Sequence, residues 1–201
     1  MTPTDDLALA EGLCARLCHD LAGPLGAAAA GAELLEDGVD ADTVSLVAAS
    51  AAGAVARLKF FRAAMGPAGS GQPAAALRDL CAAYLTAAAS AGGTGLTLSW
   101  RSEVERLDGN QGRLVLNLVL IARDALARGG EVRVDIGADT LAVGFAGQGA
   151  GLSDEVHGVL VARAEAEGPR GAQARFTRVL AEKIGRSPRF EGGDGRGVVT
   201  V

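Results

Sequence analysis

The stretch LCHDLAGPLG (residues 17–26) places a histidine and an aspartate in a run that otherwise has the composition of a buried helix. An α-helix turns about 100° per residue, so His19 points roughly 200° away from Leu17 and from Leu21. Residues three and four positions away share its face of the helix. They are Ala15, Arg16, Ala22 and Gly23, with Gly26 one turn further on. The register therefore predicts an exposed imidazole on a face where only Arg16 is large.

The glycines and the proline in this stretch need a reason of their own. Glycine inside a helix costs about 0.5–1 kcal/mol relative to alanine. Gly23 and Gly26 serve either the close approach of a partner to the imidazole or the close packing of helices. Pro24 clashes with the carbonyl of Asp20, so we expect the helix to bend one turn after the histidine. Asp20 either orients or deprotonates the ring or is simply solvated.

Residues from about 5 to 66 have the pattern of a helical hairpin. Small and apolar residues recur at steps of four and three, at Ala10, Cys14, Leu17, Leu21, Pro24, Ala28, Gly31 and Leu35. The rhythm returns after Gly38 and Asp40 at Val44, Val47, Ala51, Ala54, Leu58, Phe61 and Met65. Gly38 suits a helix C-cap, and Asp40 or Asp42 can cap the second helix. Two helices cannot enclose a core alone, so we expect a homodimer in which two hairpins form a four-helix bundle.

The remainder of the chain has a different pattern. GPAGSGQP (residues 66–73) is a linker of turn-forming residues, which divides the chain into domains at 1–66 and 67–201. The pattern predicts helices over 77–89, 112–130, 153–167 and 172–185, and strands over 95–103, 131–137, 140–147, 188–191 and 197–201. The predicted fold class is α+β, with a helical hairpin followed by a two-layer α/β sandwich.

Composition restricts the partners and the location. The 201 residues carry a net charge of −5, which argues against non-specific binding to DNA or anionic membranes. The acidic start MTPTDDLALAEG lacks the basic region of a signal peptide, and Arg16, Asp20 and Glu33 interrupt the longest apolar region. Three cysteines cannot all pair, so we expect reduced thiols and a cytoplasmic location.

Two further cations fall near the predicted depth of the histidine in the hairpin. If the hairpin turns near residues 39 and 40, then LKFFR (residues 58–62) lies level with His19. Lys59 and Arg62 either steady a phosphoryl group on the imidazole or are solvated. A metal site at Cys14, Cys18 and His19 is not expected, because the sequence offers no second ligand cluster.

The histidine stretch resembles the phospho-accepting H-box of histidine kinases, in which a histidine and an acidic residue precede a proline. CHDLAGPLGA (residues 18–27) and RLKFFRAAMG (residues 57–66) more closely resemble the ChpT family, histidine phosphotransferases of alphaproteobacteria. The resemblance implies a dimerisation bundle followed by a degenerate kinase-type ATP-binding domain. It makes His19 the residue that receives and passes on the phosphoryl group. It also implies a donor receiver on a hybrid kinase like CckA, acceptor regulators like CtrA and CpdR, and Mg²⁺ supplied by the receiver.

Two positions bear on whether the second domain still binds ATP. A kinase has two asparagines four apart in one helix, and here Asn117 is followed by Ile121. GQGAGL (residues 147–152) has glycine where the adenine-binding aspartate of a kinase stands, and GPRGAQARFTRVL (residues 168–180) only faintly matches a third glycine-rich box. Two lost polar partners cost about 2–6 kcal/mol, or roughly 30-fold to 10⁴-fold in affinity. We therefore expect a phosphorelay phosphotransferase without a cofactor or metal of its own. The alternatives are an ATP-dependent sensor histidine kinase core and a non-catalytic dimeric adaptor.

Overall fold

The computed structural model describes residues 3–92 and 95–201. Within these ranges the helices are α1 (Pro3–Asp37), α2 (Ala41–Met65), α3 (Ala74–Gly92), α4 (Gly109–Asp124), α5 (Asp154–Val161) and α6 (Pro169–Lys183). The strands are β1 (Gln72–Pro73), β2 (Leu96–Ser102), β3 (Arg106–Leu107), β4 (Gly130–Ile136), β5 (Leu141–Ala146), β6 (Arg189–Gly193) and β7 (Arg196–Thr200). The α+β fold class is confirmed.

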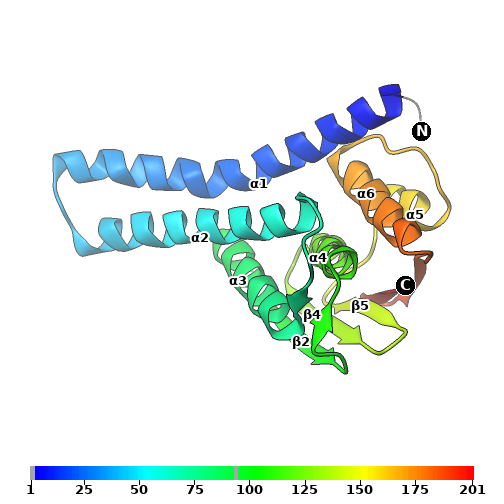
Figure 1. Cartoon of the computed structure of the whole chain (residues 1–201). Coiled ribbons are helices and arrows are strands. Elements are labelled where there is room, and N and C mark those ends of the chain that lie inside the picture. Colours follow the sequence, from blue (N-terminus) through cyan, green and yellow to red (C-terminus); the bar gives the residue numbers. More distant parts are fainter. Residues whose placement is uncertain (1–2, 93–94) are drawn as a thin grey trace.

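Helices α1 and α2 form the expected antiparallel hairpin (Figure 1). Asp40 caps α2, and its side chain accepts a hydrogen bond from the backbone N–H of Thr43 at 2.8 Å. The two helices approach closely at Gly31, where an added Cβ would lie 2.7 Å from Cγ2 of Val47. The ribbon of α1 bends near its middle (Figure 1), and α1 contains Pro24, a residue type that bends helices.

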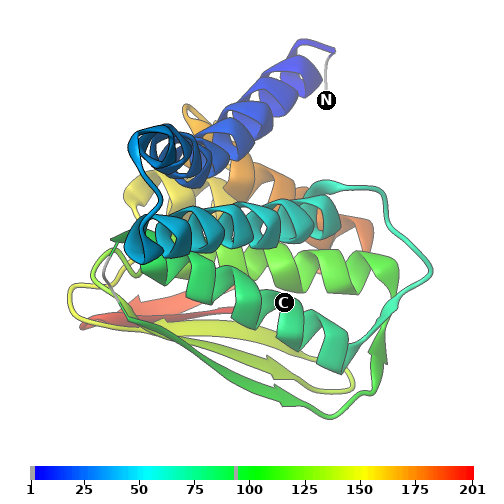
Figure 2. The same ribbon diagram turned by 90° about the vertical axis from the view of Figure 1, so that its left-hand side faces the viewer.

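The second half of the chain is a mixed sheet covered by helices on one face. The strand order is β2-β4-β5-β7-β6, with β2 and β4 parallel and the other pairs antiparallel. Strands β4 and β5 form the predicted hairpin. Figure 2 shows three levels: the sheet, then α3 and α4, then α2 against those two helices. The end of the helical hairpin is thus one more layer on the sandwich.

Helix α4 is the centre of the core. Asp108 and Gln111 form a capping box at its start, which satisfies backbone groups that the helix leaves open. Every residue from 114 to 122 is buried. Phe60 and Phe61 of α2 enter the same core, and Phe60 stacks on Tyr84 with ring centroids 4.1 Å apart. This packing buries only part of α2, which is the one helix among those described that is long and apolar enough to cross a membrane by length and composition.

Several details differ from the sequence-based expectations, among them the end of α4 at Asp124 instead of residue 130. Helix α5 ends at Val161, well before residue 167, and Arg163 follows with φ of 62°, a left-handed conformation that a helix cannot contain. Helix α6 begins earlier than expected because Pro169 suits the first turn of a helix. The predicted seam of the hairpin includes five residues that are exposed in the structure: Ala10, Cys14, Val44, Ala51 and Leu58. The buried side of α2 turns towards α3 and α4, with Ala54, Arg57, Phe60, Phe61 and Ala64 inside.

Candidate functional site

The imidazole of His19 is open to solvent, as the helical register predicts. Its side chain is 86% exposed. At Gly23 and Gly26 an added Cβ would find no other atom within 4 Å, whereas at Gly12 it would lie 2.5 Å from Cβ of Ala172 in α6. Close packing within the chain therefore explains Gly12 and Gly31 but not the two glycines beside the histidine.

Asp20 holds the histidine from one side. Its Oδ1 lies 3.1 Å from Nδ1 of His19, and its Oδ2 accepts a hydrogen bond from Nε of Arg16 at 3.1 Å. Only 8% of the Asp20 side chain is exposed, so this carboxylate is not merely solvated. An ionised carboxylate has no proton to donate, so Nδ1 of a neutral ring is the nitrogen that carries hydrogen. Nε2 is left with its lone pair.

Arg16 joins the hairpin to the second half of the chain. Its guanidinium donates two hydrogen bonds to the carboxylate of Asp124, at 2.6 and 3.0 Å. Asp124 ends helix α4 and also accepts a hydrogen bond from Arg123 at 3.0 Å. The two arginines and the two aspartates, Asp20 and Asp124, form a cluster with no formal net charge. We call these four residues the ion-pair cluster.

The ion-pair cluster keeps Asp20 ionised. Burial by itself raises the pKa of this carboxyl, but the charge of Arg16, the hydrogen bond from His19 and the charge of Arg123 outweigh it and lower the pKa. For Arg16, burial alone would lower the pKa of the guanidinium. The charges of Asp124 and Asp20 and the hydrogen bond to Asp124 outweigh burial and raise this pKa, so the guanidinium stays protonated. His19 therefore faces a permanent negative charge at neutral pH.

A groove of about 490 Å³ opens beside the histidine. Its lining residues come from α1, α4, α5 and the start of α6: they are Ala15, Arg16, His19, Asp20, Arg123, Asp124, Glu155, Gly168, Pro169 and Arg170. The structure thus brings together three of the predicted site residues, His19, Asp20 and Arg16. Lys59 and Arg62 are exposed on α2 and are not among the described residues that line this groove.

Arg123, Asp124 and Arg170 are groove residues that the sequence reasoning missed. They lie more than 100 positions from His19, and only the packing of α1 on the second half brings them close. One signal was present in the sequence. An arginine and an aspartate end the apolar run LVLNLVLIA (residues 114–122), and a charged pair at the end of so buried a helix needs partners.

The resemblance to kinases would place an ATP site between α4, residues 151–156 and α6. The hollow found there has a volume of about 80 Å³, against roughly 300–1,000 Å³ for typical small-molecule pockets. Asn117 is fully buried, and its amide donates hydrogen bonds to the carbonyls of Ala64 at 2.9 Å and of Arg113 at 2.7 Å. Its Oδ1 accepts a hydrogen bond from Gln173 at 2.5 Å. This asparagine ties α2, α4 and α6 together.

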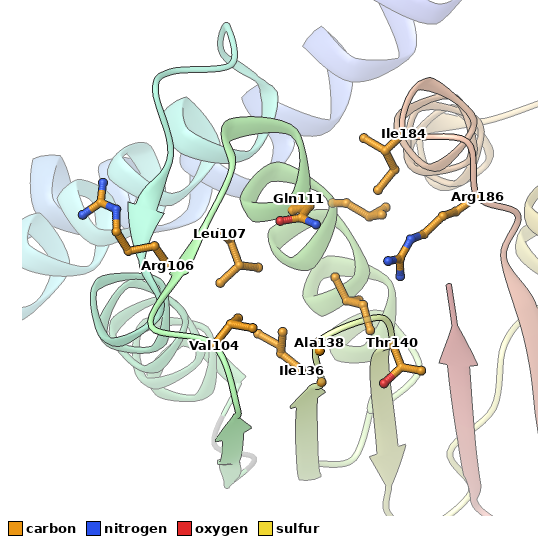
Figure 3. A pocket seen from close by; sticks show the side chains of 12 residues that line it. Val104, Arg106, Leu107, Gln111, Ile136, Ala138, Thr140, Ile184 and Arg186 are labelled. Atoms are coloured by element: carbon orange, nitrogen blue, oxygen red, sulfur yellow. The ribbon is translucent and has the colours of Figure 1, made fainter.

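Two other hollows have fewer side chains that could take part in catalysis. A cavity of about 50 Å³ near the start of α4 is lined by residues that include Gln111 and Arg186 (Figure 3). Both have structural partners, since Gln111 belongs to the capping box and Arg186 donates to the carbonyl of Val201 at 3.0 Å. A wider hollow of about 730 Å³ lies over the open face of the sheet, where Ala142, Gly144 and Ala146 leave space. Neither hollow contains a histidine or cysteine among its described lining residues.

Comparison with known proteins assigns this chain to a family. The family model for the histidine phosphotransferase C-terminal domain matches residues 82–195, which is more than half of the chain. The chain belongs to the ChpT-type histidine phosphotransferase family. The resemblance seen in the histidine stretch is thereby confirmed at the level of the family.

Individual relatives agree with this assignment. The protein phosphotransferase ChpT of Brucella abortus (strain 2308) is 39% identical over 130 residues, an alignment that spans 64% of this chain and 61% of that protein. A structure of a bacterial phosphotransferase at 1.7 Å has a TM-score of 0.83 and 28% identity, and covers 100% of this chain and 97% of its own.

The glycines of α1 yield a prediction about stability. Gly12→Ala is expected to lower the free energy of unfolding by about 1–3 kcal/mol, because its Cβ would press on Ala172. Gly23→Ala is expected to raise it by roughly 0.5–1 kcal/mol, because the added methyl meets open space and helix propensity improves. Urea unfolding at one fixed protein concentration measures both. Changes of the same sign would contradict the packing described for α1.

Proposed function

We propose that this chain is a phosphorelay phosphotransferase, in which Nε2 of His19 accepts a phosphoryl group from the aspartyl phosphate of one receiver and yields it to the aspartate of another. One observation carries the proposal: an exposed imidazole whose Nδ1 is held by a buried carboxylate, which leaves Nε2 directed to solvent. The family assignment supports the same chemistry.

The proposed transfer involves only the imidazole of His19 and the aspartyl phosphate of the receiver. The lone pair of Nε2 attacks phosphorus in line, an N–P bond forms, and the bond from phosphorus to the aspartyl oxygen breaks. The receiver carboxylate leaves with the electron pair. The ring keeps its proton on Nδ1 and gains a positive charge next to Asp20, whose carboxylate stabilises that charge as in other oriented histidines. Transfer to the second receiver reverses these events.

The surroundings of His19 support docking of a receiver. Gly23 and Gly26 leave space on the face of the imidazole. Arg123 and Arg170 line the groove beside it and supply positive charge for a phosphoryl group. Lys59 and Arg62 remain predicted phosphoryl contacts, since both are exposed on the hairpin. In this proposal the receiver brings the Mg²⁺, and this chain holds no cofactor or metal.

The proposal includes a homodimer built on the hairpin. Large apolar side chains are exposed on α2 at Val44, Val55 and Leu58, which fall within about 60° of one another around the helix. Leu25 and Leu34 are also exposed on α1, on opposite sides of that helix. A second copy of the hairpin would cover such a stripe in a four-helix bundle. The proposed location is the cytoplasm, where receivers and reduced thiols are found.

The partners follow from the family resemblance. We take the donor to be the receiver of a CckA-like hybrid kinase and the acceptors to be CtrA-like and CpdR-like regulators. A kinase function is disfavoured by the 80 Å³ left between α4 and α6 and by the engagement of Asn117 with Ala64 and Gln173. An inert adaptor is disfavoured because it would not need a histidine held in one tautomer.

One labelling experiment tests the proposal. The purified chain is incubated with radiolabelled ATP and, separately, with a CckA-type receiver charged by radiolabelled acetyl phosphate. Label from the receiver and none from ATP is the expected result. If ATP by itself labels the chain, the chain is a kinase. If neither ATP nor the receiver labels it, the result supports the non-catalytic adaptor.

A further inference from the structure

We propose that Asp124 is a positioning residue for phosphoryl transfer, which acts through Arg16 and Asp20 to fix the tautomer and orientation of His19. The inference rests on the proposed function and adds a role for the second half of the chain. Asp124 lies 108 positions from Arg16 and touches neither the imidazole nor, in the proposed reaction, the phosphoryl group.

The first link is the two-point contact between Asp124 and Arg16. Both terminal nitrogens of the guanidinium donate to this one carboxylate, and the Arg16 side chain is only 5% exposed. A guanidinium is planar, so fixing its two ends fixes the direction of the remaining N–H at Nε. That N–H points to Oδ2 of Asp20.

The second link is that the two carboxylate oxygens of Asp20 have different partners. Arg16 occupies Oδ2, and Nδ1 of His19 meets Oδ1. The carboxylate cannot rotate without breaking one of these two bonds. It therefore holds the imidazole with hydrogen on Nδ1 and the lone pair on Nε2.

Removing the carboxylate of Asp124 would change the hydrogen bonds that Arg16 donates to Asp20. Arg16 and Asp20 are four positions apart on one helix, a spacing at which an arginine can turn both Nε and a terminal nitrogen to the same carboxylate. The freed terminal nitrogens would compete with His19 for Oδ1 of Asp20. Asp124 prevents this because it occupies those nitrogens and is itself held by Arg123 at the end of the buried helix α4.

The test compares Asp124→Asn and Asp124→Glu with the exposed control Asp79→Asn in the whole chain of 201 residues. NMR of the imidazole nitrogens reads the tautomer directly. The chain contains only two histidines, so His157, which packs on Phe190, is an internal reference. Single-turnover transfer from a radiolabelled, acetyl-phosphate-charged receiver gives the rate constant at saturation and the apparent affinity separately.

Asp124→Asn is expected to shift His19 to a mixture of tautomers and to lower the saturating rate constant about 10-fold, a typical cost of losing the outer partner of an oriented imidazole. The apparent affinity for the receiver and the signals of His157 should stay unchanged. Asp124→Glu, which keeps the carboxylate, should recover most of the rate, and Asp79→Asn should match the wild type. A wild-type tautomer and a wild-type rate in folded Asp124→Asn would overturn the inference.

A second variant separates positioning from simple charge neutralisation. Arg16→Gln combined with Asp124→Asn removes one positive and one negative charge from the ion-pair cluster, so the fold should survive if the single variant does not. In this double variant no arginine competes with His19 for Oδ1 of Asp20, but Nε of Arg16 no longer holds Oδ2, so positioning predicts that the rate stays slow. Recovery of the rate to the wild-type value would overturn the inference. If the wild type accepts no label from the receiver, the proposed function fails, and the tautomer comparison alone then decides the role of Asp124.

Discussion

Substituting glutamine for His19 is expected to abolish acceptance of a phosphoryl group, with a fall in labelling rate of at least about 1,000-fold. Glutamine is polar and of similar size, so its amide N–H can still donate to Asp20 and α1 keeps its local contacts. An amide nitrogen has no available lone pair, however, and cannot attack phosphorus. The loss would therefore report on the nucleophile and not on the fold.

The measurement is transfer of label from a charged receiver, followed by a check of the bond formed. A phosphoramidate on histidine is lost in acid and survives alkali, whereas an acyl phosphate is lost in alkali. His157→Gln is the matched control, because this second histidine lies on α5 and packs against Phe190. Label on the His19→Gln protein, or its loss from the His157→Gln protein, would reject His19 as the acceptor.

Substituting methionine for Arg16 is expected to lower the free energy of unfolding by about 3–5 kcal/mol, the usual cost of removing one partner from a buried ion pair. The Arg16 side chain is 5% exposed, and without it the carboxylates of Asp20 and Asp124 lose their shared cation. Methionine retains much of the aliphatic volume, so the loss is electrostatic. Urea unfolding at fixed protein concentration measures it.

The same variant should respond to pH in a defined direction. In the wild type the pKa of Asp20 is lowered in the folded state, so its stabilisation is present above the unfolded value of about 3.9 and is lost as the pH falls through the folded value. In Arg16→Met burial is no longer opposed by Arg16, so Asp20 binds a proton more readily when folded. The difference in free energy of unfolding between the wild type and Arg16→Met should therefore become smaller below about pH 4.

Arg78→Met is the matched control for this prediction. Arg78 pairs with Asp79, but the two side chains are 52% and 69% exposed. An exposed pair contributes about 0–1 kcal/mol, so this variant should unfold nearly as the wild type does. A cost below 1 kcal/mol for Arg16→Met, or one that does not change with pH, would contradict the buried role given to Arg16.

Much of the fold could be predicted because it depends on local signals. Asp40 and Asp108 start their helices through side-chain caps, and residues 131–137 and 140–147 alternate in the way that β4 and β5 require. The expected end of α5 was wrong because the left-handed backbone at Arg163 leaves no clear mark in the sequence. Leu58 was misplaced because a helical period does not say which of two neighbours the helix faces.

The sequence alone determined that His19 stands on the outer face of a bent helix, next to an acid and among small residues. Helical geometry is fixed by spacing, so exposure follows from the order of residues near position 19. Only the tertiary structure decided what holds the histidine. Arg16 could have been a surface cation, and it became the link to Asp124 because α1 packs on the second half of the chain. Contacts between residues 108 positions apart depend on how whole elements pack, and no local pattern of residues specifies that.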